Sequence, residues 1–287
     1  MTHPEQRAIF ASVKGDTPLC LHDAPGHIQS LPLAALPGIH HAFSTRRGGV
    51  SRPPFHTLNL GSGVPDDPAA VRENRRRFFG AFGLDPSRVV RVRQAHGDEV
   101  LVVDGALADR ENFPRLLLDE HSAYDAMVTD REGLALVITT ADCLPIFIAD
   151  PVRRAVAAVH AGWRSTLKGI AAKALAALVA AYATRPADCV AAIGPGILGC
   201  CFEVDEPVVG PLRAAIPAWE SFARPVRPGH WLLDLAALNA HLLAEGGLPP
   251  AQIHRTGLCT ACRTDLFYSY RAEKPLTGRM MSALWLG

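Results

Sequence analysis

The sequence predicts an α/β fold, α+β in its irregular order of elements, built as a layered sandwich with mixed β-sheets in a single domain. Short apolar runs recur between segments containing Gly, Pro and Asp, a pattern typical of buried strands. Helical patterns are interspersed among these runs without the regular alternation of a Rossmann fold or a TIM barrel. The 287 residues, 48% of them hydrophobic, are enough for a large core, and no linker-like stretch divides the chain.

The predicted elements follow in chain order. Residues 1–38 are rich in Pro, Gly and His without clear periodicity, which indicates an N-terminal lead-in, loose or an edge strand, before a main domain at 39–287. Strands are expected at 39–45, 88–94, 99–103, 125–129, 134–139, 145–149, 154–160, 188–193, 252–258, 266–270 and 279–286. Helices are expected from Asp66 or Asp67 through the RRR run, from Ser165 as N-cap to about Tyr182, and at 205–216 and 234–245. The helix from Ser165 is apolar almost all round, which predicts burial between layers.

Composition and charge exclude several classes of protein. The net charge of +1 provides no bulk field for nucleic acid or an anionic membrane, and the Arg75–Arg77 cluster is best interpreted as a solvated helix face. The N-terminus has no apolar h-region, and no uncharged apolar run is long enough to span a bilayer. Seven cysteines without a secretory signal favour reduced thiols. We therefore expect a cytoplasmic protein without nucleic-acid or membrane partners and leave its oligomeric state open.

Three residues with metal-binding side chains lie at predicted strand ends. His96 follows the strand at 88–94, Cys143 follows that at 134–139, and His160 ends that at 154–160. Side chains at adjacent strand ends can meet in space whatever their separation in sequence. Two imidazoles and one thiolate form a three-ligand set that suits zinc with one position left open. Each residue alone is more often structural, so the prediction depends on the trio.

A second set of residues indicates an anion site beside this trio. His160 is followed by a short loop and the predicted start of a helix at Ser165, where free amides and the charge of Arg164 attract anions. Lys168 lies one turn further, and Arg46 follows another strand end. The alternative that Arg164 and Lys168 merely pair with surface carboxylates stays open. Asp142 precedes the thiol, and because neighbouring strand residues face opposite sides, it misses the metal unless the backbone turns.

The remaining cysteines form two short motifs. Cys259 and Cys262 make a Cys-x-x-Cys, which is typical of redox chemistry or of half a zinc site. Only Cys200 and Cys201 are placed to complete four thiolates, and they are adjacent rather than spaced. We expect the Cys-x-x-Cys to be neither catalytic nor a zinc site.

The combined motifs resemble one known family. QAHG, TADCLPIFIAD, HAGWRS, IGPGILGCCFEV, GLCTACRTDLFYSYR, GRMMSALWL and HAFSTRRGGVSRPPFHTLNLG together are similar to the laccase-domain, or multicopper polyphenol oxidase, family over about residues 38–287. Its members are also described as purine nucleoside phosphorylases with adenosine deaminase activity. The resemblance implies an α/β sandwich with mixed sheets, zinc on His96, Cys143 and His160, and Arg46 beside the site. Ser165 departs from the usual glycine and crowds the predicted anion loop.

The function we expect is that of a zinc-dependent purine nucleoside enzyme, a transferase and hydrolase. It would phosphorolyse adenosine- or inosine-type nucleosides and deaminate adenosine, with nucleoside and phosphate as small-molecule partners. Arg46, Cys143, His160 and Arg164 are the predicted catalytic residues, and Arg46, Arg164, Ser165 and Lys168 the predicted phosphate-binding ones. Three alternatives stay open: a cysteine hydrolase or amidase using Cys143 and His160, a copper-dependent polyphenol oxidase, and an interaction protein with a structural metal. The 12 histidines include no His-x-His pair, which disfavours a multicopper cluster and leaves copper as an adventitious or alternative metal.

Overall fold

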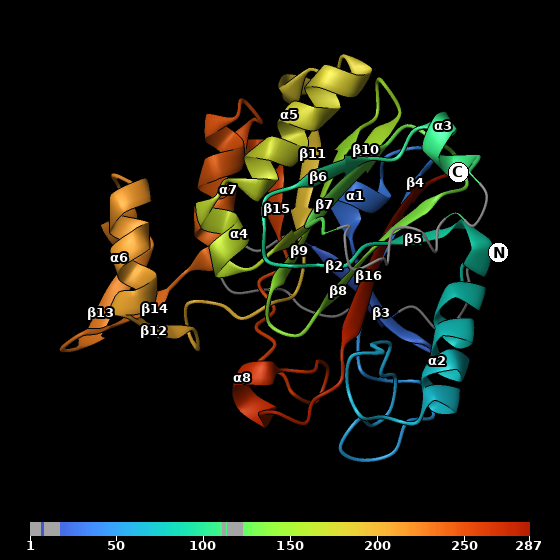
Figure 1. Cartoon of the computed structure of the whole chain (residues 1–287), viewed down its shortest axis with the longest axis horizontal. Helices are drawn as coiled ribbons and strands as arrows, with labels where there is room; N and C mark the ends of the chain where they lie inside the picture. Colours follow the sequence, from blue (N-terminus) through green and yellow to red (C-terminus); the bar gives the residue numbers. More distant parts are fainter. Residues whose placement is uncertain (1–6, 9–17, 111–112, 114–122) are drawn as a thin grey trace.

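The computed structural model describes residues 7–8, 18–110, 113 and 123–287, and it confirms a mixed α/β sandwich (Figure 1). The seven-stranded sheet has the order β1 (Arg7–Ala8), β2 (Leu19–Asp23), β3 (Gly26–Ser30), β4 (Ile39–Ser44), β16 (Met280–Leu286), β8 (Ala135–Thr140), β5 (Val89–Arg91). The six-stranded sheet has the order β15 (Ile253–Arg255), β11 (Val190–Ile193), β9 (Leu144–Asp150), β10 (Ala155–Ala161), β7 (Ala126–Thr129), β6 (Val100–Val102). Most neighbouring strands are antiparallel, whereas β5 with β8, β6 with β7 and β11 with β15 are parallel. Both sheets are therefore mixed, as predicted.

The two sheets pack face to face over a shared apolar core. Their strands are near-continuous runs of buried residues, as expected for strands covered on both sides. Phe43 of β4 stacks on Phe147 of β9 with ring centroids 4.8 Å apart, and Ile138, Val156 and Leu284 belong to the same core cluster. This core holds the carboxyl ends of several strands rigidly, which is where the candidate site lies.

Helices cover both outer faces of the paired sheets. The helices of the described residues are α1 (Leu31–Ala34), α2 (Pro68–Gly80), α3 (Gly105–Ala108), α4 (Trp163–Leu167), α5 (Ile170–Tyr182), α6 (Glu206–Ala215), α7 (Leu235–Glu245) and α8 (Tyr270–Glu273), of which α6 lies beside the sandwich and not on it. One face of α5 and of α7 packs on the six-stranded sheet, and α2 packs Phe78 and Phe79 on the other sheet. Single-turn 3₁₀ helices among the described residues include those at 86–88, 186–188, 219–221 and 250–252. The molecule is thus layered helix, sheet, sheet, helix.

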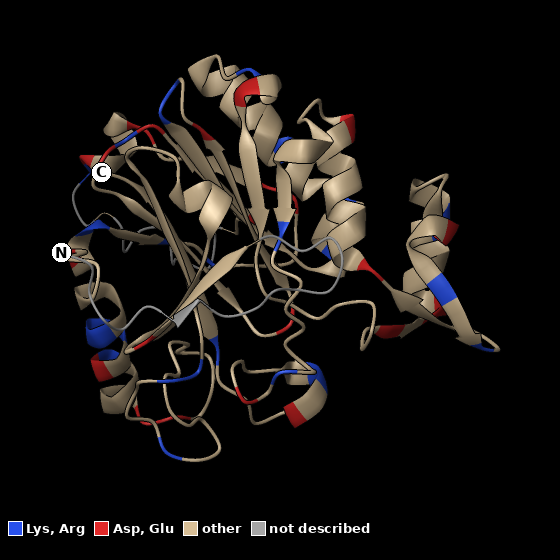
Figure 2. Cartoon of the chain, turned by 180° about the vertical axis from the view of Figure 1, so that it is seen from behind, with Lys and Arg blue, Asp and Glu red and all other residues tan. Residues whose placement is uncertain are grey.

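A small three-stranded sheet lies to one side of this sandwich, next to α6 (Figure 1). It has the order β12 (Glu203–Asp205), β14 (His230–Leu233), β13 (Ala223–Arg227). Basic and acidic residues are interspersed over the described elements (Figure 2), in keeping with the small net charge. Within the described part of the chain, no helix has the length and apolar character needed to cross a membrane.

The structure corrects two of the predicted elements, the helix from Ser165 and the strand at 266–270. The single helix expected from Ser165 is two helices, because Gly169 adopts a left-handed conformation at φ 77° between α4 and α5. Helix α5 is not buried between layers on all sides as expected, because Val179 on one side of it is exposed. No strand forms at 266–270, where buried aromatic residues occupy turns and the Tyr268 hydroxyl donates to the Phe55 carbonyl at 2.6 Å. The lead-in expected at 1–38, loose or an edge strand, contains β2 and β3 toward one edge of the large sheet, while 1–6 and 9–17 lie outside the described residues.

Candidate metal centre

The three predicted ligands meet at one end of the sandwich. In the antiparallel pairing of β9 and β10, Leu144 lies opposite Ala161, so Cys143 and His160 are close although 17 positions separate them in the chain. The donor atoms of His96, Cys143 and His160 all lie within 4.8 Å of one another, and the Cys143 Sγ is 3.7 Å from the His96 Nε2. The predicted convergence of the trio is confirmed.

Asp125 organises this trio and was not singled out from the sequence. Its buried carboxylate accepts hydrogen bonds from the backbone amides of Ala95, His96 and Gly97 at 3.1, 3.0 and 2.6 Å. It also accepts from the Nδ1 of His160 at 2.7 Å, which turns the Nε2 of that ring toward the cluster. A carboxylate behind a histidine ligand fixes the tautomer and the orientation of the ring. One buried side chain therefore positions the backbone at His96 and the imidazole of His160.

The electrostatics of the trio favour the form of the cysteine that binds metal. Burial by itself raises the pKa of the Cys143 thiol, but the charge of His160 and hydrogen bonds from both imidazoles outweigh it and hold this pKa at about 6. Burial lowers the pKa of His160, yet the Cys143 thiolate and the Asp125 carboxylate raise it to about 9. The thiolate is the ligand form of cysteine, so the site is prepared to exchange a proton on the imidazole for a metal ion.

Gly162 makes room for the trio. A Cβ atom at this position would lie 2.8 Å from the Cδ2 of His96 and 3.1 Å from the Sγ of Cys143, closer than side-chain atoms tolerate. The glycine after His160-Ala161 is therefore required for the two other donors to approach. A close-packed set of two nitrogens and one sulfur fits zinc, so the residues present fit the metal that the resemblance implies.

The trio opens into a cavity of about 660 Å³, a size typical of small-molecule sites. Its lining includes Thr139–Cys143, Ile197 and the aromatic side chains of Trp163, Phe202 and Tyr270. It also includes five arginines from distant parts of the chain: Arg75, Arg91, Arg93, Arg271 and Arg279. A metal trio and a cationic wall thus face the same space, which is suited to an anionic or phosphate-containing ligand.

Three of these arginines, Arg75, Arg91 and Arg279, are partly buried in the cavity wall. Arg75 donates from Nε to the Leu60 carbonyl at 2.8 Å, while its Nη2 is buried without a hydrogen-bond partner in the described structure. Burial first, and then the charge of Arg91, lower the pKa of Arg75 to about 10, and burial lowers the pKa values of Arg91 and Arg279 as well. An anion between these guanidinium groups would relieve that cost. The solvated-face interpretation of the RRR run holds for its other two members, which pair with Glu73, but Arg75 lines the cavity.

The predicted anion site around Ser165 is not supported by where its residues lie. Arg164 is exposed and stacks over the Trp163 ring at 4.3 Å, and Lys168 lies 3.8 Å from Asp98. The Oγ of Ser165 accepts from the Gly162 amide at 2.9 Å and stays within the turn. None of the three lines the cavity, and helix α4 has only five residues. The open alternative, surface pairing, describes Lys168 correctly.

Arg46 also lies outside the lining of the cavity. It is buried, its Nη1 pairs with Glu273 at 2.7 Å, its Nε donates to the His56 carbonyl, and its guanidinium stacks on Tyr268 at 4.4 Å. Its Nη2 is buried without a hydrogen-bond partner among the described residues. These contacts tie Arg46 to the loop before α8, and its position does not support the predicted contact with substrate.

Asp142 uses its carboxylate to hold loops in place. The residue has a φ of 88°, a left-handed backbone conformation that is uncommon for residues other than glycine. The carboxylate accepts from the hydroxyls of Thr260 and Ser269 at 2.6 and 2.8 Å and from the Arg271 amide at 2.6 Å. These bonds direct it toward the loops, and Cys143 next to it faces the imidazoles.

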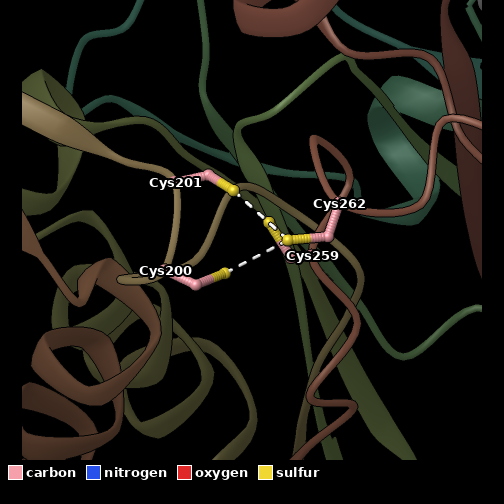
Figure 3. A group of neighbouring side chains, drawn as sticks. All are labelled: Cys200, Cys201, Cys259 and Cys262. Atoms are coloured by element: carbon pink, nitrogen blue, oxygen red, sulfur yellow. Dashed lines mark hydrogen bonds between the residues drawn. The ribbon is translucent and has the colours of Figure 1, made fainter.

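The structure contradicts the premise that Cys200 and Cys201, being adjacent, are poorly spaced to join the Cys-x-x-Cys. Cys200, Cys201, Cys259 and Cys262 are brought together, with all four sulfurs within 4.8 Å of one another (Figure 3). Adjacency of the first two in sequence does not keep them apart from the Cys-x-x-Cys.

Fold and site together define a mixed α/β sandwich with a two-histidine, one-cysteine metal-binding trio beside an arginine-lined cavity. The family model described as multi-copper polyphenol oxidoreductase laccase matches residues 40–287, and this chain belongs to that family.

Curated relatives and solved structures agree with this assignment. The chain is 40% identical over 253 residues to "Purine nucleoside phosphorylase ORF3" of Streptomyces griseus, covering 86% of this chain and 94% of the relative. It is 36% identical over 240 residues to "Purine nucleoside phosphorylase YlmD" of Bacillus subtilis, covering 84% and 86%. Among solved structures, the Bacillus licheniformis hypothetical protein YfiH has a TM-score of 0.84 at 34% identity, covering 92% and 98%. YlmD from Geobacillus stearothermophilus has a TM-score of 0.84 at 32% identity, covering 92% and 97%.

Proposed function

We propose that this protein is a zinc-dependent purine nucleoside phosphorylase. The observation that carries the proposal is the shared cavity of about 660 Å³, in which a metal-binding trio faces a wall of arginines, most of them partly buried. Phosphorolysis needs a site for phosphate next to a site for the nucleoside, and this cavity offers cationic and aromatic surfaces side by side. The names of the relatives at 36–40% identity support the same reaction.

In this proposal His96, Cys143 and His160 bind the metal, and Asp125 orients the His160 ring. Two nitrogens and a thiolate suit Zn²⁺, and copper is the alternative occupant because it competes well for such donors. When bound there, the ion supplies a Lewis acid for an oxygen or nitrogen of the substrate.

Phosphate is placed against Arg75, Arg91 and Arg279 in this proposal, since all three line the cavity and are partly desolvated. In phosphorolysis an oxygen of phosphate bonds to the ribose C1′ while the bond from C1′ to the purine nitrogen breaks. The departing base takes the bonding electrons and a proton, and ribose 1-phosphate remains. Because the ribosyl transition state is cationic, holding the phosphate anion close to C1′ both orients the attack and stabilises the charge.

The purine is placed against the aromatic part of the lining. Trp163 and Phe202 line the cavity and also pack on the core of the six-stranded sheet, so their rings are held firmly. A fixed ring offers a stacking surface at little cost in side-chain freedom. Deamination of adenosine is a further prediction for this site, and the same assay would detect it as inosine.

One observation favours a cysteine hydrolase as the second candidate. In space, Cys143 contacts His160 and His160 contacts Asp125, as a nucleophile, its base and an orienting group would. His96, however, places a second imidazole 3.7 Å from the same sulfur, which a hydrolase does not need and a metal site does. A copper cluster of the laccase type has less support, because each donor group found in the described part of the chain contains at most two histidines.

The test is a nucleoside panel on the full chain, with metal analysis of the same sample. Zinc-loaded, copper-free protein given adenosine or inosine should release adenine or hypoxanthine with ribose 1-phosphate, and only when phosphate is present. His160→Ala should abolish these products. A zinc form that is inert on purine nucleosides, beside a copper form that oxidises phenols at enzymatic rates, would establish the oxidase instead. Hydrolysis by metal-free protein that depends on Cys143 would establish the cysteine enzyme.

A further inference from the structure

Four cysteines outside the cavity lining form a cluster to which the proposed function gives no role. Cys200 and Cys201 lie in the turn before β12, and Cys259 and Cys262 lie in the loop after β15 (Figure 3). The two loops are held side by side by backbone pairing of Gly196 with the segment around Cys259. The Gly196 amide donates to the Leu258 carbonyl at 3.3 Å, and the Thr260 amide donates to the Gly196 carbonyl at 3.0 Å.

The sulfurs are spaced as ligands of one metal ion would be. The Sγ of Cys262 is 3.2 Å from that of Cys201 and 3.5 Å from that of Cys200, and all four sulfurs lie within 4.8 Å of one another. Four sulfurs at the usual zinc–sulfur distance of about 2.3 Å in a tetrahedron are about 3.8 Å apart. A small adjustment of side-chain torsions therefore converts this cluster into a tetrahedral set.

A backbone amide supports a thiolate at the most buried of these residues. The Leu198 amide donates to the Sγ of Cys259 at 3.5 Å. The Arg263 amide donates to the Cys259 carbonyl at 3.0 Å, which closes the Cys-x-x-Cys into a tight turn. Amides directed at a thiolate stabilise its charge and fix its direction as a ligand.

The turn before β12 explains how two adjacent cysteines reach one point. The amides of Cys201 and Phe202 both donate to the Leu198 carbonyl at 2.9 Å, which curls the chain on itself. In an extended strand, neighbouring side chains would face opposite sides. In this turn both sulfurs face Cys262 (Figure 3).

We propose that Cys200, Cys201, Cys259 and Cys262 bind a second metal ion, Zn²⁺, in a closed four-thiolate site. Four protein ligands leave no open position, so the role of this ion is structural. The inference rests on the geometry of the cluster and is independent of the reaction at the trio.

The ion would clasp two loops that form part of the cavity. One loop supplies Ile197 and Phe202 to the cavity lining. The other loop contains Thr260, whose hydroxyl donates to Asp142, the residue next to Cys143. The Arg271 side chain, also in the lining, donates to the Glu203 carbonyl at 2.8 Å. Fixing these loops would hold one wall of the cavity in place.

Zinc stoichiometry of the full chain tests the proposal. After reduction, loading with Zn²⁺ and desalting, elemental analysis should find about two zinc ions in the unaltered chain. The His96→Ala/His160→Ala variant should keep one, and adding Cys259→Ser and Cys262→Ser should leave none. Cys20→Ser is the matched control, because Cys20 lies in β2 outside both clusters, and it should keep both ions.

A second measurement needs no change in the four cysteines. In the His96→Ala/His160→Ala variant, Zn²⁺ should protect Cys200, Cys201, Cys259 and Cys262 from alkylation, as counted by peptide mass spectrometry.

A separate variant alters one of the four ligands. Cys262→His should retain the ion, because three cysteines and one histidine also form a closed zinc site. Absence of zinc from His96→Ala/His160→Ala, or equal alkylation of the four thiols with and without zinc, overturns the proposal. A disulfide among them in the unaltered chain, with no zinc bound after reduction, assigns the cluster to redox chemistry.

Discussion

The two cysteine-containing clusters of this protein differ in ligand type, in surroundings and in the elements that position them. The trio combines two imidazoles with one cysteine sulfur at strand ends beside a cavity, whereas the other cluster brings four cysteine sulfurs together between two loops. With a metal ion bound as proposed, the trio would leave one coordination position open beside the cavity, whereas four cysteine ligands would leave none. Under these proposals the same residue type would serve chemistry in one place and architecture in the other, according to how many protein ligands surround the ion.

The largest effect is expected from Cys143→Ala, which removes the only sulfur of the trio. We expect loss of the metal at this site and of phosphorolysis down to background, because two imidazoles alone form an incomplete site. The four-thiolate cluster should keep its ion in this variant. Elemental analysis together with a nucleoside assay measures both, and full metal content in Cys143→Ala would reject the trio.

Asp125→Asn should weaken the trio without removing a ligand. The amide cannot reproduce the charged contact to the His160 Nδ1 at 2.7 Å, nor all three backbone contacts around His96. Loss of such an outer partner lowers metal affinity on the order of ten- to a hundredfold. Competition with a chelator of known affinity measures the change. Unaltered affinity would mean that Asp125 serves the fold alone.

Arg91→Ala and Arg164→Ala compare the cavity wall with the predicted anion loop. Arg91 lines the cavity and Arg164 does not, so the first change should raise the KM for phosphate on the order of tenfold or more and the second should change it less. Steady-state kinetics at varied phosphate would reveal the difference. The reverse order would restore the segment around Arg164 and Ser165 as the phosphate site.

The smallest effect on turnover is expected from Cys262→Ser. This residue lies outside the cavity lining, so kcat should fall only about threefold or less while one zinc ion is lost. Tm should fall, at roughly 2–4 °C per kcal/mol lost for a chain of this size. Cys20→Ser provides the comparison in calorimetry. A loss of turnover as complete as in Cys143→Ala would show that the loop cluster takes part in the reaction.

The sequence predicted the sheets and the trio well because both depend on local patterns. Short apolar runs bounded by loop residues become strands wherever a second layer covers them, and Cys143 and His160 lie at the ends of such runs. The prediction of elements failed where an apolar run can be buried without forming the expected strand or continuous helix. The aromatic run at 266–270 is buried in turns, and Gly169 interrupts a helix that its composition alone would continue.

Sequence by itself determined the mixed α/β class, the candidate metal-binding trio and the lack of the His-x-His pairs that a multicopper cluster needs. Tertiary structure alone decided the surroundings of that trio. Asp125, Arg91 and Arg279 come from distant segments, and nothing in their local sequence states which way their side chains turn. The position of Arg46 and the union of Cys200 with Cys262 were decided in the same way. Periodicity reports whether a residue is buried, but only the packing of segments far apart in the chain determines what it is buried against.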